Sequence, residues 1–389
     1  MTCSPETLGV RAGIATDVAH GAVAPSLVLS ANFAFAGFGQ KRTYDYTRSG
    51  NPTRDELAKA LAALEGGAGA VVTATGMAAI TLVLHLLQAD DLVLMPHDGY
   101  GGTWRLLSAF ARTGRCRVRF VDQRDPAALA AALAERPKLV WAESPSNPLL
   151  RLVDLRALAA ASHAVGALFV VDNTFLSPAL QNPLQLGADL VVHSTTKYVN
   201  GHSDVVGGAV VAKDRALHEQ LVWWANALGI TGAPFDSWLT LRGLRTLQLR
   251  MRQHSANAQA LAELLAADPA VRAVHYPGLL QHPDHALALR QQRGAGGMLS
   301  FELADPAAVP RFLDGLAHFT LAESLGGVES LVAHPATMTH ASMTAEARAA
   351  AGIGPGLLRL SVGIEDMADL ARDLRLALQR CALVPTGPG

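Results

Sequence analysis

Short, continuous apolar runs that alternate with helix-like segments constrain the fold of this chain more than any other feature of its sequence. The runs lie at 70–73, 92–95, 117–121, 139–141, 167–171, 190–192 and 209–211. The segments between them are rich in alanine and leucine. Strands that are apolar throughout, and not only at every second residue, are typical of a mainly parallel sheet covered by helices on both faces. We therefore predict an α/β domain of about seven strands that ends near residue 215.

The 389 residues are too many for one ordinary hydrophobic core, so we expect more than one domain. Residues 1–52 lack sustained periodicity and contain several glycines and prolines, which indicates an extended arm that packs on something else. Residues 53–248 are assigned to the α/β domain, with a long helical connection at 216–250. Residues 249–389 have apolar runs at 271–276 and 298–303 and helical patterns near 255–267, 307 and 366–380, which predicts a smaller α+β domain.

The composition disfavours several classes of partner. The net charge is −1 and the basic residues are scattered, which argues against a nucleic-acid or anionic-membrane surface. The chain has no apolar stretch of about 18 residues and no signal-peptide pattern at its start. Its three cysteines are far apart and lack metal-ligand spacing, so we expect a cytoplasmic protein without a metal site. Only 17% of residues are charged, which favours burial between subunits over one large single-chain core.

Two chemically active side chains follow neighbouring apolar runs. Asp172 comes directly after the run 167–171, and Lys197 follows 190–192 within His193-Ser194-Thr195-Thr196-Lys197. In open α/β sheets ligands bind at the carboxyl ends of the strands. A neutral lysine there can form an imine with an aldehyde, and a carboxylate can pair with a protonated ring nitrogen. Taken singly, the aspartate could be a helix N-cap and the lysine an ordinary surface residue.

The first apolar run leads into a possible anion site. Gly76 and Met77 open a helix after the strand at 70–73, and free backbone amides at such a helix terminus bind anions. An ordinary glycine turn explains this pattern equally well on its own. The chain has no GxxxxGK[ST] motif and no GxGxxG motif between a strand and a helix, which disfavours nucleotide binding.

Further candidates lie outside these runs. Tyr100 could stack on a planar cofactor. Tyr46 and Arg48 belong to the arm, which favours binding a phosphate from outside the domain. Arg359 lies within the apolar run 357–361, where a buried cation needs a carboxylate from either a substrate or an internal salt bridge.

Six segments carry a resemblance to a known family: 46–54, 96–102, 143–148, 171–175, 193–204 and 324–330. Over Pro25 to about Leu376 the chain resembles the Cys/Met-metabolism family of pyridoxal 5′-phosphate (PLP) enzymes. The resemblance implies the PLP-dependent transferase fold of the aspartate aminotransferase type, PLP as cofactor, and a homotetramer built from two active dimers.

The resemblance also implies roles for residues at matching positions. Lys197 would carry PLP as an imine and move protons, Asp172 would bind the pyridine nitrogen, and Tyr100 would stack on the ring and help to deprotonate the incoming amine. The phosphate would be held by the amides of Gly76 and Met77, by Ser194 and Thr196, and by Tyr46 and Arg48 of a neighbouring subunit. The substrate α-carboxylate would be held by Asn147, Ser324 and Arg359, and its side-chain end by Arg105, Glu323 and Ser49.

The implied reaction is γ-replacement on an amino-acid substrate. O-succinyl-L-homoserine (or O-acetyl-L-homoserine) and L-cysteine would give L-cystathionine and succinate (or acetate), a step of transsulfuration and methionine biosynthesis. Leu325 and Val328 stand where β-lyases of this group tend to carry bulkier aromatic residues. Ser49 stands where synthases can have a second arginine, so the acyl group stays open. The alternatives are cystathionine γ-lyase activity, then O-acylhomoserine sulfhydrylase activity, then a non-catalytic binding protein of the same fold.

Overall fold

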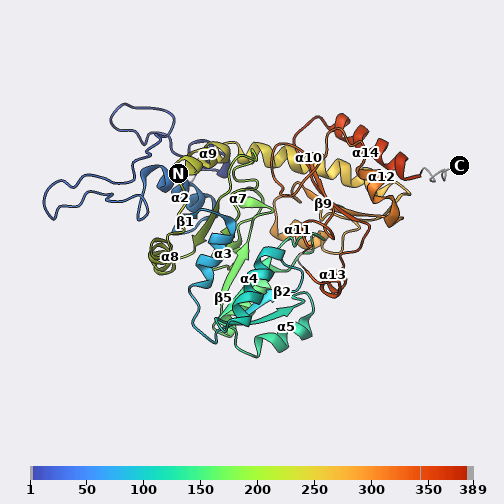
Figure 1. Cartoon of the computed structure of the whole chain (residues 1–389), viewed down its shortest axis with the longest axis horizontal. Helices are drawn as coiled ribbons and strands as arrows, with labels where there is room; N and C mark the ends of the chain where they lie inside the picture. The colour runs from blue at the N-terminus through green and yellow to red at the C-terminus, as the bar shows by residue number, and fades with distance from the viewer. Residues whose placement is uncertain (1–2, 342, 383–389) are drawn as a thin grey trace.

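A seven-stranded sheet forms the first part of the molecule in the computed structural model, which describes residues 3–341 and 343–382 (Figure 1). The strand order is β1 (Gly69–Thr73), β7 (Gly208–Ala212), β6 (Leu190–His193), β5 (Leu168–Asp172), β4 (Leu139–Glu143), β2 (Leu92–Pro96) and β3 (Arg117–Val121). Only β7 runs antiparallel to its neighbours β1 and β6, and the other pairs are parallel. The predicted mainly parallel seven-stranded sheet is confirmed.

Successive residues of the central strands face two different cores. Val171 and Val191 pack with residues of α2 (Pro52–Glu65), α5 (Pro126–Leu133), α6 (Leu155–Ala164) and α9 (Pro234–Leu244). Val170 and Val192 pack on the other face with α3 (Gly76–Leu84), α4 (Gly101–Arg112) and α8 (Arg215–Leu228). Because helices cover both faces, each central strand is apolar at consecutive positions, which is the pattern seen in the sequence.

The second part of the molecule contains a five-stranded sheet. Its strand order is β10 (Thr320–Leu321), β11 (Leu331–Ala333), β12 (Leu357–Ser361), β9 (Met298–Leu303) and β8 (Val271–His275). The helices α10 (Leu247–Ala266), α12 (Val309–Leu313) and α14 (Met367–Ala382) pack on it, while α11 (His285–Gln291) and α13 (Ala345–Ala351) lie in the connections. The predicted connection at 216–250 consists of three helices, because Gly229 ends α8 in the left-handed conformation and α9 and α10 follow. The boundary placed at 248 falls inside α10.

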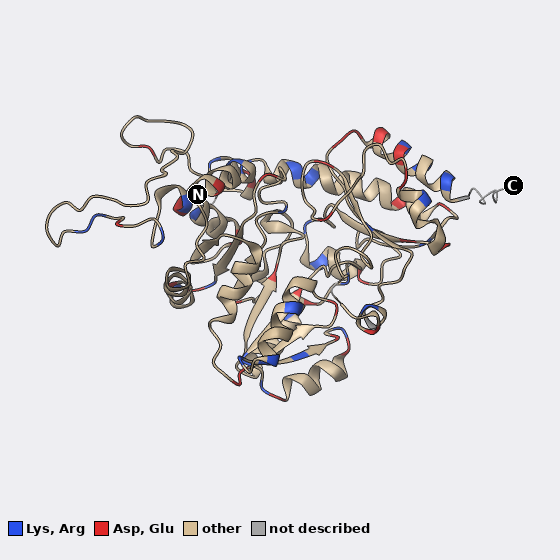
Figure 2. Ribbon diagram, viewed as in Figure 1, with Lys and Arg blue, Asp and Glu red and all other residues tan. Residues whose placement is uncertain are grey.

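The first 50 residues contain α1 (Pro5–Val10) and otherwise little regular structure. Two loops of this region extend away from the body of the molecule, drawn in dark blue in Figure 1. The first 50 residues carry several exposed hydrophobic side chains, among them Val18, Leu29, Phe35 and Phe38. Acidic and basic residues are interspersed along the rest of the chain (Figure 2). Within the described residues, no helix combines the length and the apolar character needed to cross a membrane.

Candidate active site

The carboxyl ends of β4, β5 and β6 bring the main candidate residues to one edge of the large sheet. Asp172, the last residue of β5, pairs in register with Glu143 on β4 and with Val192 on β6. Lys197 lies on the loop that follows β6. The Asp172 carboxylate accepts a hydrogen bond from the Thr174 amide at 3.0 Å, and no helix begins there, so it is not a helix N-cap. Its burial raises the pKa of Asp172.

The Lys197 amine is held by the second part of the molecule. Its Nζ donates to Ser324 Oγ at 2.6 Å. Burial, together with the positive charge of Arg359, lowers the pKa of Lys197 to about 8. A lysine with this pKa is about half neutral at pH 8 and can act as a nucleophile or a base.

Ser324 occupies a backbone conformation that side chains rarely adopt. Its φ is 80°, in the left-handed region, where a residue other than glycine is strained. Nearby Gly326 has a φ of 79°, and a Cβ there would lie 2.7 Å from the Tyr198 amide nitrogen. The loop therefore runs directly against the backbone next to Lys197, and this contact holds the strained Ser324 hydroxyl at the lysine amine.

Arg359 lies on the central strand β12 and is 3% exposed. Its Nη1 donates to Asn147 Oδ1 at 3.0 Å and its Nη2 donates to the Ser324 carbonyl at 2.9 Å. Its Nε has no hydrogen-bond partner among the described residues, and no carboxylate of that part of the chain forms a salt bridge with it. A buried guanidinium that meets only neutral oxygens can bind the carboxylate of a ligand.

The amino end of α3 provides a second place for an anion. Thr75 caps the helix by accepting from the Ala78 amide at 2.9 Å, whereas the Gly76 and Met77 amides make no hydrogen bond within the described residues. A Cβ at Gly76 would lie 2.8 Å from the Ser194 Cβ, so only glycine lets the helix end lie against Ser194. The Thr196 hydroxyl, by contrast, is engaged with the Gly207 backbone at 3.0–3.1 Å.

Tyr100 precedes α4, and its amide donates to both carboxyl oxygens of Glu143 at 2.9 Å. The Tyr100 ring is 41% exposed. Burial raises the pKa of Tyr100 and the nearby Arg105 lowers it. Arg105 and Glu323 are exposed, and the Glu323 charge acts on Tyr100, Lys197 and Arg359. Burial and the neighbouring Asp172 carboxyl raise the pKa of Glu143.

The structure does not bring the arm residues to the Lys197 of their own chain. Arg48 Nη1 donates to the backbone oxygen of Asn226 at 2.8 Å and to its side-chain oxygen at 2.9 Å, and the guanidinium lies 5.5 Å from the centre of the Tyr46 ring. Ser49 Oγ donates to the Tyr46 carbonyl and to Asp45. Among the described residues, neither Tyr46, Arg48 nor Ser49 forms a hydrogen bond with Lys197.

Three buried residues near the strand ends received no role from the sequence: Glu65, Glu143 and His193. Glu143 and His193 belong to the segments that carry the family resemblance, but a motif does not say what each member contacts. Glu65 had a signal of its own. It is the last residue of α2, before Gly66, and a negative charge is disfavoured at the carboxyl end of a helix, which indicates a partner elsewhere in the fold.

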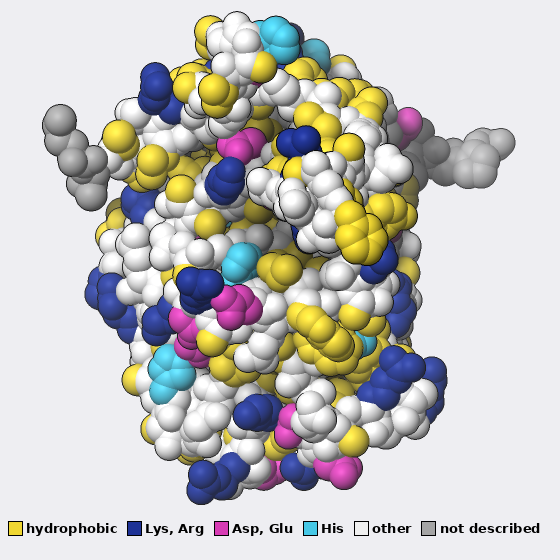
Figure 3. Space-filling model, turned by 90° about the vertical axis from the view of Figure 1, so that its left-hand side faces the viewer, with side chains coloured by type: hydrophobic (Ala, Val, Ile, Leu, Met, Phe, Trp, Pro, Cys, Tyr) yellow, Lys and Arg dark blue, Asp and Glu magenta, His cyan; other side chains and the backbone are white. Residues whose placement is uncertain are grey.

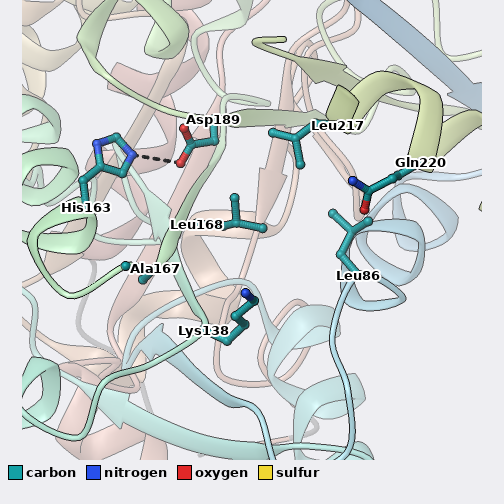
Figure 4. A pocket seen from close by; sticks show the side chains of 9 residues that line it. Leu86, Lys138, His163, Ala167, Leu168, Asp189, Leu217 and Gln220 are labelled. Carbon is teal, nitrogen blue, oxygen red and sulfur yellow. Dashed lines mark hydrogen bonds and ion pairs between the residues drawn. The ribbon is translucent and has the colours of Figure 1, made fainter. Parts of the chain in front are cut away.

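A cavity of about 480 Å³ lies at the opposite edge of the large sheet (Figure 4). Its polar lining residues include Lys138, His163 and Asp189, and His163 Nε2 lies 2.9 Å from Asp189 Oδ2. Lys138 and Asp189 directly precede β4 and β6, at the amino ends of the strands. This cavity is therefore separate from the site around Lys197.

The comparisons with known proteins cover almost the whole chain. Residues 6–379 match the family described as Cys/Met metabolism PLP-dependent enzyme. The chain belongs to this family. It is 58% identical to the cystathionine gamma-synthase of Escherichia coli over 96% of this chain and 97% of that protein.

Solved structures agree with this assignment. The cystathionine gamma synthase of Xanthomonas oryzae pv. oryzae is 65% identical, with a TM-score of 0.97 over 98% of this chain and 99% of that chain. It was crystallised with aminoacrylate and cysteine, and also with cystathionine. The cystathionine gamma-lyase of Lactobacillus plantarum, crystallised with L-serine, is 41% identical with a TM-score of 0.94, over 97% of this chain and 99% of that chain. The protein is thus an enzyme that uses PLP and has the fold implied by the resemblance.

Proposed function

We propose that this enzyme catalyses γ-replacement, in which the thiol of L-cysteine displaces the acyloxy group of an O-acyl-L-homoserine to form L-cystathionine. One observation carries the proposal: the 65% identical structure with a TM-score of 0.97 is a cystathionine gamma synthase that was crystallised with cystathionine. The site of this chain has the groups that such an amino-acid substrate needs. We place the reaction in the cytoplasm, as the cysteine content suggests.

The residues at the strand ends fit each functional group of PLP. The half-neutral Lys197 amine suits the aldehyde, and the buried Asp172 carboxyl suits the ring nitrogen. The free amides of Gly76 and Met77, with Ser194 beside them, suit the phosphate. Tyr100 offers a partly exposed aromatic ring for stacking on the cofactor. Thr196 lies on the same loop as Ser194, and we assign it to the phosphate site as part of this loop, because its hydroxyl is bonded to Gly207.

Bound PLP supplies an electron-accepting ring, which makes the Cα and Cβ protons of the substrate acidic and permits loss of the γ-acyloxy group. Lys197 Nζ removes the Cα proton and later returns it, and its neutral form is available because its pKa lies near 8. The Ser324 hydroxyl orients that amine through the 2.6 Å hydrogen bond. In its phenolate form, which the nearby Arg105 favours, the Tyr100 side chain takes a proton from the incoming amino group.

Substrate orientation follows from the second part of the molecule. Arg359 binds the α-carboxylate, with Asn147 and Ser324 fixing its guanidinium on two sides. This directs the substrate side chain toward Arg105 and Glu323, two exposed residues whose charges act on Tyr100. Arg105 supplies the positive charge for a succinyl carboxylate, so we propose the succinyl ester as the preferred substrate.

A competition assay with the purified holoenzyme tests the reaction. The enzyme is incubated with O-succinyl-L-homoserine with and without L-cysteine, with the O-acetyl ester in the same way, and with L-cystathionine alone. We expect cystathionine formation from the succinyl ester to exceed both the rate with the acetyl ester and the breakdown of cystathionine. Faster breakdown than formation would make the enzyme a γ-lyase. Repeating the assay with sulfide in place of L-cysteine tests the alternative that the enzyme is an O-acylhomoserine sulfhydrylase.

The γ-lyase activity is the second candidate. The gamma-lyase of Lactobacillus plantarum shares the fold at a TM-score of 0.94, so the fold itself does not separate the two reactions. Leu325, which is buried beside the Ser324 loop, is compatible with both the synthase and the γ-lyase. The difference must therefore lie in how the pocket admits the thiol and holds the acyl group.

A further inference from the structure

A buried pair of ionisable residues lies behind the candidate cofactor site. Glu65, the last residue of α2, and His193, the last residue of β6, have side chains with 0% exposure. His193 Nε2 lies 2.8 Å from Glu65 Oε1. Because both side chains are fully buried, the proposed reaction gives this pair no direct part.

The hydrogen bonds of Glu65 fix its charge. Its Oε1 also accepts from Asn173 Nδ2 at 2.9 Å, and its Oε2 accepts from Asn182 Nδ2 at 3.2 Å. The orientation of the Asn182 amide is certain, because its oxygen accepts from Arg293 Nη2 at 2.8 Å and an arginine can only donate. A carboxyl group that receives N–H donors on both oxygens is stabilised in its ionised form. Glu65 is therefore a buried anion.

A buried anion needs a cation nearby, and His193 is in direct contact with it. The position of Glu65 at the carboxyl end of α2 increases this need, because the helix dipole there is negative. Arg293 also faces the cluster, but its guanidinium reaches Glu65 only through Asn182. The other ring nitrogen of His193, Nδ1, is buried and has no hydrogen-bond partner among the described residues.

The pair is connected to the carboxylate that faces the cofactor. Asn173 directly follows Asp172 in the chain. Its side-chain amide donates to Glu65, and its backbone amide donates to the Val192 carbonyl at 3.0 Å. Positive charge on His193 lowers the pKa of Asp172, in opposition to the burial that raises it. On its other side Asp172 pairs in register with Glu143 of the neighbouring strand, and burial together with the Asp172 charge raises the pKa of Glu143.

We propose that Glu65 and His193 form one charged unit, with His193 as an imidazolium, that keeps Asp172 in its carboxylate form and so keeps the ring nitrogen of bound PLP protonated. Both are positioning residues, because they act through Asp172. The proposal rests on the assignment of Asp172 to the ring nitrogen, but it does not depend on which thiol or ester the enzyme uses.

The test compares the binding of PLP with that of deazapyridoxal phosphate, in which a C–H group replaces the ring nitrogen. Dissociation constants for both are measured on the full-length protein after removal of its cofactor. The ratio of the two constants reports the contribution of the ring nitrogen alone. His193→Gln removes a positive charge that favours the Asp172 carboxylate, so it should lower the preference for PLP about tenfold and leave the affinity for the analogue within about twofold.

Three further variants make the result decisive. Glu65→Gln/His193→Gln replaces the ion pair with a neutral hydrogen-bonded pair of similar size, so it should fold even if the single variant does not, and it should lower the preference as far as the single variant does. His254→Gln removes an equally buried histidine, which is hydrogen-bonded to the Val362 carbonyl at 2.7 Å, and should leave the ratio unchanged. Asp172→Asn should abolish the preference.

Two results would overturn the proposal. Equal loss of affinity for PLP and for the analogue would mean that the pair only supports the structure. An unchanged ratio in the neutral double variant, or in Asp172→Asn, would mean that no charge is relayed to the ring nitrogen. Failure of the γ-replacement reaction itself would appear separately, since no substrate enters these measurements.

Discussion

Lys197 depends on both sheets of the molecule: its backbone follows a strand of the large sheet, and its amine is hydrogen-bonded to a residue of the second part. The loop after β6 positions its backbone, while Ser324 from the second part of the molecule accepts the hydrogen bond of its amine. Burial and Arg359 lower its pKa to about 8. The pKa of the residue that we propose to carry the cofactor is therefore lowered by the residue that we propose to bind the substrate.

This coupling predicts a pH dependence of cofactor attachment. Only the neutral amine attacks the PLP aldehyde, so the rate at which the full-length apoenzyme combines with PLP should rise with pH, with a midpoint near pH 8. Arg359→Met removes a positive charge that lowers the pKa of Lys197, so the pKa rises and the midpoint should move to higher pH. Stopped-flow absorbance measures both. Arg372→Met, on the exposed side of α14, is the control and should not move the midpoint.

Two variants of Ser324 separate the effect of its strained backbone from the effect of its hydroxyl group. Ser324→Ala and Ser324→Gly both lose the hydrogen bond to Lys197, so both should lower kcat. Only glycine relieves the left-handed conformation, so its free energy of unfolding should exceed that of the alanine variant by about 1 kcal/mol. Denaturant unfolding of the two proteins checks this. Equal stability of the two variants would show that the conformation stores no strain.

The residues of the site differ in how far their sequence reveals them. Asp172 and Lys197 could be predicted because each follows a buried strand, and the ends of parallel strands meet at one edge. The contacts of Lys197 with Ser324 and of Asn147 with Arg359 could not, because they join positions far apart in the chain and depend on how the two sheets pack. The contact between Glu65 and His193 could not be predicted either, because it also joins positions far apart in the chain.

At the scale of elements, the strands were easier to predict than the helices. Each strand of the large sheet is bounded by a change from apolar to polar residues, so the seven runs matched β1 to β7 within a few residues. The region around 216–250 was predicted as one helical connection although Gly229 and Pro234 mark the end of α8 and the start of α9, because the helices on either side have similar compositions. The antiparallel direction of β7 was also not evident, since an apolar strand looks the same in either direction.

The arm is the element whose placement decides the architecture of the site. Arg48 is turned toward Asn226 of α8 and away from the Lys197 of its own chain, and Tyr46 lies beside it. We propose that both complete the phosphate site of a neighbouring subunit, and that Ser49, on the same turn, faces the acyl group there. A site shared between subunits predicts complementation.

Lys197→Ala and Arg48→Ala subunits should each be inactive or nearly so alone. After co-refolding, each mixed dimer should contain one site with an intact lysine and an intact arm. Random mixing should then restore about a quarter of the wild-type sites, since half of the dimers are mixed and half of their sites are complete. The activity of the whole refolded mixture measures this, and two affinity tags verify that mixed oligomers have formed. Activity no higher than that of the parent variants would show that each site is built within one subunit.

For the whole molecule, the surface composition points to assembly. The face that carries the arm has hydrophobic side chains spread over it (Figure 3). Exposed large hydrophobic residues of the chain include Trp223 of α8, Phe235 of α9 and Phe38 of the arm. Exposed apolar surface of this kind marks protein interaction sites. We therefore expect a homotetramer, with a mass in light scattering about four times 40.8 kDa. A monomer of the same mass as the chain would contradict both the tetramer and the shared site.

The extended arm also has a consequence for the life of the protein in the cell. Its segments around Val18 and Phe38 contain no helix or strand, so we expect a protease to cut them before subunits associate and not afterwards. Newly made chains that fail to find a partner would then be degraded first. Limited proteolysis during refolding should accordingly show the arm losing its sensitivity at the same rate as activity appears, which makes the arm a marker by which finished enzyme is distinguished from orphan subunits.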